Sequence, residues 1–148
     1  MHEFRFDWAF PGEEEPRKTL TVMVGRLRNQ RMTMSTVAPT KTTGEFIAKR
    51  IVAFLRECGC EMVDVVLKAD QEPVMESIFK AVARERAAKG AMRTVIENSP
   101  KGESQSNGVV ERAVGAVEGM MRVMRSAIEE RLKVKLSYEH AIWPWIME

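Results

Sequence analysis

The chain has 148 residues, of which 45% are hydrophobic and 30% are charged, and its formal net charge is +2. These values describe an ordinary soluble globular protein of about one domain. A net charge this small neither requires nor excludes a nucleic-acid partner. The sequence has no run of about 18 apolar residues, so it predicts no membrane span. Cys58 and Cys60 are too close in sequence for an unstrained disulfide, which favours a reducing compartment.

The N-terminal third predicts an antiparallel meander of three strands. Residues 4–10 alternate strictly, with aromatic side chains on one face and Asp7 on the other. After a turn with two prolines, residues 19–27 and 32–37 are typical of two further strands, joined by a tight hairpin. Asp7 is therefore expected in the middle of the first strand, and Trp8 is expected in the core rather than in a base-stacking platform.

The middle of the chain predicts helices alternating with strands. A capping box at Thr42 and Glu45 begins the first helix, and Pro73 is suited to the first position of the second. The strand between them ends in Lys68-Ala69-Asp70. The expected elements are a helix that follows the cap at Thr42 and is stopped by Gly59, a buried strand over 62–67, a helix over 73–89 and a strand over 91–97.

The last third predicts the longest helix of the chain. Residues 98–107 are rich in Ser, Gly, Pro and Lys and have no buried pattern, so we expect a mobile loop. From Val110 to Ile128 apolar residues recur in steps of four and three, which indicates a helix that continues to about residue 133. A last short helix is expected over 137–147, limited by the proline within it.

Glu111 lies near the start of that long helix. Ser106 or Asn107 can cap the helix, which places Glu111 in its first turn. An acid at this place is ordinary, because the helix dipole favours an anion there. Taken alone, Glu111 is more often a partner of the dipole than a ligand.

Two short motifs change that interpretation. Residues 105–112, Gln-Ser-Asn-Gly-Val-Val-Glu-Arg, resemble the third acidic motif of the retroviral and retrotransposon integrase catalytic core, the DDE family. Lys68-Ala69-Asp70 is similar to the second motif, a buried strand that ends in Asp. The resemblance implies a ribonuclease H-like α/β fold. Its five-stranded mixed sheet has an antiparallel three-strand meander plus two parallel strands, with helices on both faces. The element order derived above agrees with that order.

The resemblance implies that Asp7, Asp70 and Glu111 are the catalytic acids and hold two Mg²⁺ or Mn²⁺ ions. Carboxylate oxygens are the hard ligands that these ions prefer. Two such ions about 4 Å apart can activate an attacking oxygen and stabilise a leaving one in phosphodiester transfer. Forty residues separate Asp70 from Glu111, more than in the best-known retroviral members, and residues 98–107 could absorb the difference.

The activity implied by the resemblance is that of an integrase, which processes DNA 3′ ends and joins them to target DNA. Residues 1–148 would form one catalytic core, without the family's zinc-binding N-terminal and basic C-terminal domains. Expected partners are the element's DNA ends, the target duplex and further copies of the chain in a homodimer or higher oligomer. Trp143 and Trp145 could serve that interface. The expected location is the nucleus or the cytoplasm, with no membrane partner.

The expected DNA contacts lie on the loop and on the long helix. Gly108 would be a hinge for the loop, because a residue without a Cβ is free of its steric restriction. Two departures from the family pattern weigh against DNA binding by the usual residues. Gln71-Glu72-Pro73 lacks the family's glycine, and Gly115 and Glu118 stand where retroviral members carry lysines. Other residues would therefore have to hold DNA. The expected contacts are Lys101, Gln105, Asn107, Arg112 and Arg122. Two further candidate cations are Arg125 and Lys89.

Two other functions remain open from the sequence. One is a nuclease of the ribonuclease H class on the same fold, although such enzymes usually add a fourth acid. The other is a decayed element whose folded domain no longer catalyses and only binds nucleic acid or protein. The arginines of the long helix fit a solvated face with pairs such as Glu118–Arg122 as well as they fit DNA contact.

Overall fold

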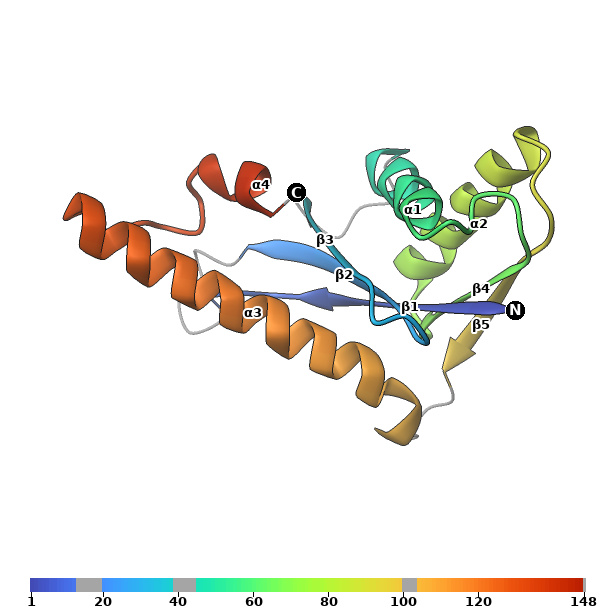
Figure 1. The fold of residues 1–148 in the computed structure, drawn as a ribbon, viewed down its shortest axis with the longest axis horizontal. Coiled ribbons are helices and arrows are strands. Elements are labelled where there is room, and N and C mark those ends of the chain that lie inside the picture. Colours follow the sequence, from blue (N-terminus) through green and yellow to red (C-terminus); the bar gives the residue numbers. More distant parts are fainter. Residues whose placement is uncertain (13–19, 39–44, 100–103, 148) are drawn as a thin grey trace.

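The computed structural model describes residues 1–12, 20–38, 45–99 and 104–147, with the backbone alone described over 104–107. Figure 1 shows the elements in these ranges. They are β1 (His2–Ala9), β2 (Thr21–Leu27), β3 (Thr33–Ala38), α1 (Glu45–Glu57), β4 (Val65–Asp70), α2 (Pro73–Ala88), β5 (Thr94–Ser99), α3 (Ser104–Leu132) and α4 (Ile142–Ile146).

The five strands form one mixed sheet in the order β3-β2-β1-β4-β5. The first three strands are an antiparallel meander, while β1, β4 and β5 run parallel to one another. The predicted ribonuclease H-like sheet is therefore confirmed. Because parallel strands need a crossover, α1 lies between β3 and β4 in the chain and α2 lies between β4 and β5.

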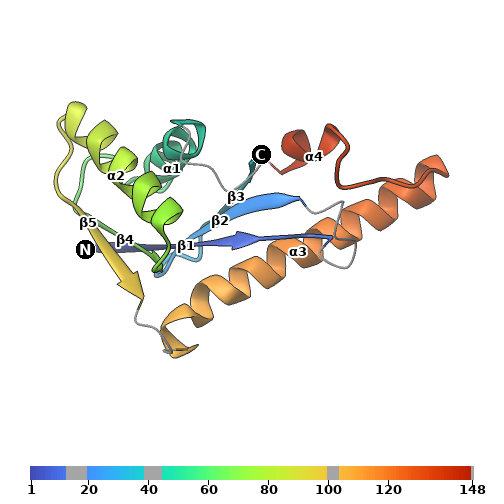
Figure 2. The same ribbon diagram turned by 180° about the vertical axis from the view of Figure 1, so that it is seen from behind.

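The first face of the sheet is covered by α1 and α2 (Figure 2). The aromatic side chains of β1 point to this face, as their alternation predicts, and Trp8 belongs to the core. The rings of Phe4 and Phe54 meet edge to face with centroids 5.7 Å apart, and those of Phe6 and Phe79 with centroids 5.5 Å apart. These contacts fix which way β1 presents its other side chains.

The second face is covered by α3 and α4, so helices lie on both faces as predicted (Figure 1). The buried stripe of α3 packs on the sheet through Ala113, Val117 and Met121, against small side chains of β1 and β2 that include Ala9 and Val24. Ala9 is two residues from Asp7 and shares its face. Thus α3 covers the face of β1 that carries the acid.

Hydrogen bonds and a cation–π contact join the C-terminal end of α3 to the segment that leads to α4. The Glu129 carboxylate accepts hydrogen bonds from the Leu136 N–H at 2.8 Å and from Arg125 Nε at 3.2 Å. These bonds and the Arg125 and Lys135 charges outweigh the burial that raises the Glu129 pKa, and hold that pKa below its usual value. The Arg125 guanidinium lies over the Tyr138 ring, 4.6 Å from its centroid.

Both parallel strands begin later than the sequence predicts. The expected strands over 62–67 and 91–97 are Val65–Asp70 and Thr94–Ser99. The carbonyls before β4 are taken by other partners, because the Met92 N–H donates to Met62 O and the Arg86 guanidinium donates to Val63 O. Asp70 is the last residue of β4, as expected.

The start of the long helix was also predicted too late. It begins at Ser104, so residues 104–107 are helical and the caps expected at Ser106 and Asn107 are wrong. One glycine at Gly108 costs a helix only about 1 kcal/mol, which is too little to end a helix of 29 residues that packs on a sheet. The remainder of the expected loop, residues 100–103, and the cap expected at Thr42 lie outside the described residues.

The last helix is shorter than predicted, Ile142–Ile146 instead of 137–147. Trp143 is fully buried, and its Nε1–H donates to Ser137 O at 2.9 Å. It is a core residue, so its predicted use in a dimer interface is wrong. Trp145, by contrast, is 80% exposed. Within the described ranges, no helix is long and apolar enough to cross a membrane.

Candidate active site

The first acid of the site is set by the alternation of β1. Phe4 and Phe6 face α1 and α2, so Asp7 faces the side of the sheet that α3 covers. Its Cα lies opposite that of Val24 in β2. The Asp7 carboxylate accepts the Trp8 N–H at 2.8 Å, which holds the side chain close to its own strand.

The second acid lies on the neighbouring strand. The parallel pairing of β1 with β4 ends with Arg5 opposite Lys68, and Asp7 and Asp70 each follow two residues later on their own strands, so we call these two acids the acid row. Neighbouring strands are about 4.8 Å apart, and residues in one row point to the same face. Asp70 is exposed at the end of β4, opposite Ser99 in β5. Asp7 and Asp70 therefore point to the same face of the sheet, beyond the last pair of β1 and β4.

The third acid comes from α3. Glu111 is exposed and follows the buried Val110, about 100° around the helix from the stripe that packs on the sheet. The expectation that Glu111 lies in the first turn is wrong. Because α3 begins at Ser104, Glu111 lies about two turns inside the helix, and no acid lies in the first turn.

The three carboxylates are not gathered into one cluster in this conformation. Among the described residues, no three side chains of the types His, Cys, Asp and Glu lie close enough together to hold a metal ion. The pair formed by Asp7 and Asp70 offers the hard oxygen donors that suit Mg²⁺ or Mn²⁺. Completing the predicted set requires Glu111 to approach that pair from α3.

The predicted DNA contacts have different outcomes. Arg112 and Arg122 are exposed on α3, and Arg112 Nε donates to the carbonyl oxygen of Gly108 at 3.1 Å. Gln105 and Asn107 lie on the first turn of α3, where only the backbone is described, and Lys101 lies outside the described residues.

Two further cations named from the sequence are placed elsewhere. Lys89 follows α2 and precedes β5, so it lies by the amino ends of the parallel strands, whereas Asp70 lies at a carboxyl end. Lys89 is therefore at the opposite end of these strands from Asp70. Arg125 is paired with Glu129 at 3.2 Å and stacked on Tyr138, so it is already engaged within the protein.

Gly108, the predicted hinge, is helical in this conformation. It lies within α3 and is half-buried, and its φ is not positive. A Cβ added to it would meet only Arg112 Nη2, at an ordinary contact distance of 3.8 Å. The helix thus has room for alanine here, and a need for glycine would have to come from another conformation.

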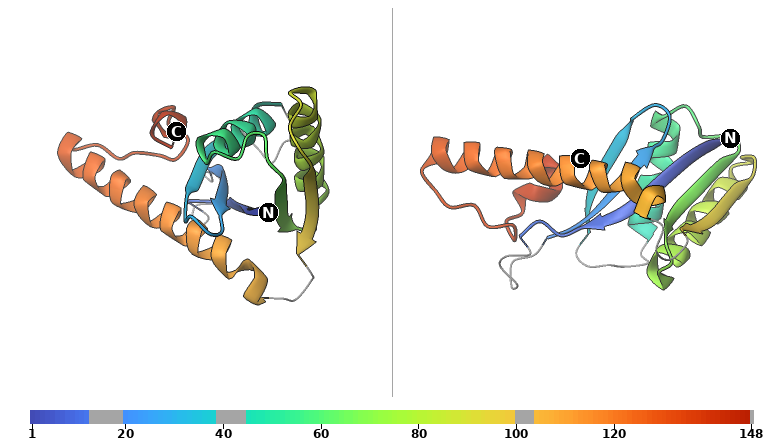
Figure 3. Two further views of the ribbon diagram at one scale, coloured as in Figure 1. Left: turned by 45° about the vertical axis from the view of Figure 1, so that its right-hand side comes forward. Right: turned by 90° about the horizontal axis from the view of Figure 1, so that it is seen from below.

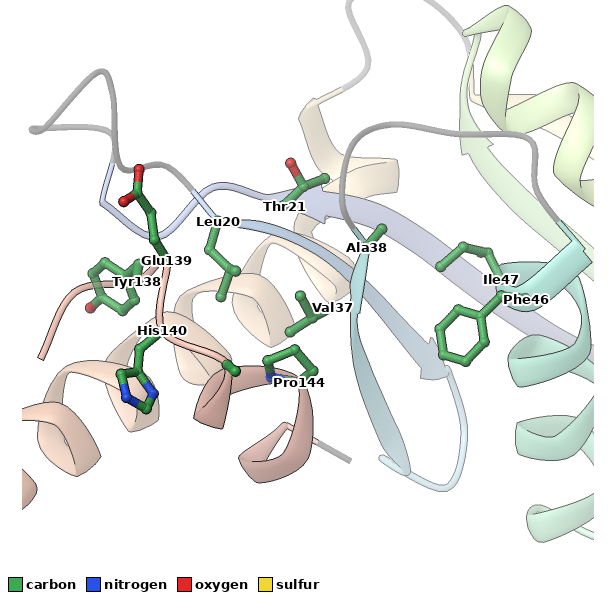
Figure 4. A pocket seen from close by; sticks show the side chains of 11 residues that line it. Leu20, Thr21, Val37, Ala38, Phe46, Ile47, Tyr138, Glu139, His140 and Pro144 are labelled. Atoms are coloured by element: carbon green, nitrogen blue, oxygen red, sulfur yellow. The ribbon is translucent and has the colours of Figure 1, made fainter.

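A large apolar pocket lies away from the acids (Figure 4). It has a volume of about 710 Å³ and none of the three acids lines it. Its walls come from β2, β3, α1, α4 and the segment before α4, and include Leu20, Val37, Phe46, Tyr138 and Pro144. Such a lining lacks the hard oxygen ligands of a phosphodiester site, so we place the candidate active site at the acids instead.

No protein-family model matches the chain, and no curated protein matches it in sequence. Solved structures do match it. The catalytic core domain of BIV integrase has a TM-score of 0.52 and 17% identity over 87% of this chain and 71% of that one. The HTLV-2 integrase catalytic core domain has a TM-score of 0.54 and 13% identity over 83% of this chain and 70% of that one. The fold is that of a retroviral integrase catalytic core.

A third integrase structure gives the highest of the three TM-scores. It is the simian T-cell lymphotropic virus intasome in complex with a PP2A regulatory subunit, with a TM-score of 0.64 and 13% identity. The match covers 91% of this chain but 44% of the intasome chain. Identities this low establish the integrase-core fold, and the roles of individual residues rest on the geometry of the site.

An ion-pair network beside the acids was missed by the sequence analysis. The Glu3 carboxylate meets Arg5 Nε at 2.6 Å, Arg28 Nη1 at 3.3 Å and Lys68 Nζ at 3.8 Å, and Lys68 also meets Glu97 at 3.1 Å. Burial raises the pKa of Glu3, but the hydrogen bond and charge of Arg5, with the charges of Lys68 and Arg28, hold that pKa below its usual value. The alternation Glu3-Arg5-Asp7 was visible in the sequence, whereas the register between β1 and β4 was not.

Proposed function

We propose that this chain is the catalytic core of an integrase-type polynucleotidyl transferase that acts on DNA with divalent metal. The observation that carries the proposal is the row formed by Asp7 and Asp70. The two carboxylates share one face of an integrase-core sheet, and α3, which bears Glu111, covers that face. The magnesium in the HTLV-2 core structure supports a divalent cation here.

Each acid has a proposed role. Asp7 and Asp70 form the fixed part of the site, because both lie on strands in the middle of a packed sheet. Glu111 is the adjustable part, because it is exposed on a helix. Mg²⁺ or Mn²⁺ held by the three acids would supply charge neutralisation to the phosphodiester and activation of the attacking oxygen. Arg112 and Arg122 would hold DNA phosphates, which need only well-placed cations.

The proposed DNA reaction is the processing of 3′ ends and their joining to a target duplex. We further propose that the chain works as a homodimer or higher oligomer. The neighbours support this assembly, since one is an intasome and another is a trimeric form. The exposed Trp145 is a candidate contact between copies.

The test is an oligonucleotide assay in Mn²⁺ that scores both cleavage and joining of a labelled DNA end. Asp7→Asn, Asp70→Asn and Glu111→Gln should each abolish both products, since each removes one charged ligand. The matched control is Glu130→Gln, an exposed acid on the same helix, nineteen residues beyond Glu111. It should keep wild-type activity.

The assay also separates the two rival functions. Metal-dependent cleavage without joining would assign the chain to the nucleases of the ribonuclease H class. DNA binding without either product would indicate a non-catalytic domain. Activity that survives Asp7→Asn would remove the proposed site altogether.

A further inference from the structure

A row of cations crosses the sheet beside the acid row. In the register of the sheet, Arg26 of β2 lies opposite Arg5 of β1, Arg5 lies opposite Lys68 of β4, and Lys68 lies opposite Glu97 of β5. Three positive side chains are thus direct neighbours on the face covered by α3. Like charges directly opposite one another destabilise a sheet, so this row needs compensation from nearby acids.

The compensation within the ion-pair network is incomplete. Among the ion pairs of the described residues, Glu3 and Glu97 supply two negative charges for the three cations of the row, and Glu3 also pairs with Arg28 at 3.3 Å. Arg5 is only 5% exposed, so water screens its charge poorly. In the described structure, Arg5 Nη1 is buried without a hydrogen-bond partner. A buried positive charge therefore remains on this face.

The missing negative charge is found in the next row. Asp7 follows Arg5 by two residues on β1, and Asp70 follows Lys68 by two residues on β4, so all four side chains share one face. Two residues of a strand span about 6.6 Å, a distance at which unit charges interact appreciably under partly buried conditions. The cation row and the acid row are therefore complementary neighbours.

We propose that the row of Arg26, Arg5 and Lys68 is the built-in counter-ion of the Asp7–Asp70 pair, with Arg5 as its central positioning residue. The cations hold the two carboxylates side by side before a metal binds, and they weaken the binding of divalent cations by competing for the same negative charge. This inference rests on the proposed function, because it assumes that Asp7 and Asp70 are metal ligands.

Contact with DNA is a poorer account of the same cations. A phosphate would have to reach Arg5, which is buried between Glu3 and the neighbouring strands. Lys68 is also engaged, with 24% of its side chain exposed and acids on both sides. The exposed arginines of α3 are available for phosphates, whereas this row faces its own acids.

The test measures Mn²⁺ binding to the DNA-free protein from the loss of the free-ion electron paramagnetic resonance signal. Arg5→Gln should bind Mn²⁺ about tenfold more tightly than the wild type, because a unit charge that repels the ion is removed. Arg5→Lys keeps the charge and should restore an affinity near that of the wild type. Arg28→Gln removes a cation that pairs with Glu3 outside the row, and should leave the affinity unchanged.

Thermal unfolding gives a second readout. Without metal, Arg5→Gln should melt below the wild type, and saturating Mn²⁺ should raise its melting temperature more than it raises that of the wild type. A purely structural arginine would lower both melting temperatures equally. If Arg5→Gln does not fold, Lys68→Gln at the less buried β4 end of the row replaces it, with the same expected direction.

The outcomes separate this inference from the proposed function. If Asp7→Asn abolishes Mn²⁺ binding but Arg5→Gln and Lys68→Gln leave the affinity unchanged or weaker, the counter-ion role is wrong and the proposed site stands. If the wild type shows no Mn²⁺ binding that depends on Asp7, the proposed function fails and the counter-ion role fails with it.

Discussion

Gly25 of β2 lies directly opposite Phe6 of β1, and a Cβ at Gly25 would overlap the Phe6 ring. The ring fills the space that a side chain would need, and it packs edge to face on Phe79 of α2. Phe6 immediately precedes Asp7 on the strand. Because the Phe6 side chain is packed on the first face of the sheet, the Asp7 side chain points to the second face. A packing contact between two strands thus sets the direction of a candidate metal ligand.

Gly25→Ala should therefore destabilise the protein by about 1–3 kcal/mol, since the added methyl group displaces a packed ring. Urea unfolding followed by tryptophan fluorescence measures the change. Gly115→Ala is the matched control, because nothing lies within 4 Å of a Cβ at that helical glycine. It should stabilise the protein by about 0.5–1 kcal/mol. Equal effects of the two substitutions would contradict the packing explanation.

Neutralising the acids should cost activity without costing stability. Asp7→Asn keeps an oxygen that can accept the Trp8 N–H, and Glu111→Gln changes an exposed side chain. Each should change the unfolding free energy by no more than about 0.5 kcal/mol without metal, because for Asp7 the lost attraction to the cation row is offset by the lost repulsion from Asp70. Calorimetry in EDTA measures this. A fall of several degrees in melting temperature would mark the acids as structural partners.

Gly108→Ala tests the predicted hinge. Alanine fits the helical conformation of Gly108 and should raise the stability of α3 by about 0.5–1 kcal/mol. If the first turns of α3 must rearrange to bring Glu111 to the other acids, the same change should slow strand joining. Turnover and melting temperature are measured on one preparation. Unchanged turnover in the alanine variant would show that no hinge is needed at this residue.

The network around Glu3 predicts a pH dependence of stability. The folded pKa of Glu3 lies below its usual value of 4.5, so its contribution is fully present above pH 4.5 and is lost as the pH falls through the folded pKa. The wild type should exceed Glu3→Gln in stability at pH 7, and this difference should narrow by pH 3.

Urea unfolding at the two pH values checks this prediction. Glu76→Gln is the control, because Glu76 forms only an exposed pair with Lys80 at 2.9 Å, and it should change stability little at either pH. A difference between the wild type and Glu3→Gln that stays constant from pH 7 to pH 3 would refute the ionic role of Glu3.

Much of this fold follows from local pattern. The alternation of β1 predicts both the core position of Trp8 and the opposite face for Asp7, and the element order predicts the mixed sheet. The pairing between β1 and β4 is different, because it joins segments about sixty residues apart and is set by packing rather than by either segment alone. For that reason, the sequence alone could not predict the relative positions of Asp7 and Asp70 along their strands, or the cation row beside them.

Errors in the expected boundaries have similar causes. The late start of β4 depends on Arg86, a residue of α2 whose guanidinium donates a hydrogen bond to the carbonyl oxygen of Val63. The early start of α3 depends on a helix long enough to continue through Gly108. Trp143 was expected at a dimer interface from the integrase resemblance, whereas the return of the chain beyond α3 buries it. Each of these outcomes is decided by a partner distant in sequence.

The length of α3 has a mechanical consequence. Its 29 residues form a rod of about 43 Å whose C-terminal turns extend beyond the strands (Figure 3). The rod packs on the sheet around Val117. Glu111 lies about 9 Å along the helix on one side of Val117, and Arg125, which stacks on Tyr138, lies on the other side. A tilt of about 5° about that fulcrum moves Glu111 by about 0.8 Å, comparable to displacements that cost an active site about 100-fold in rate. If the helix moves as a rigid rod, it acts as a lever, and we expect forces on its far end to reach the third acid.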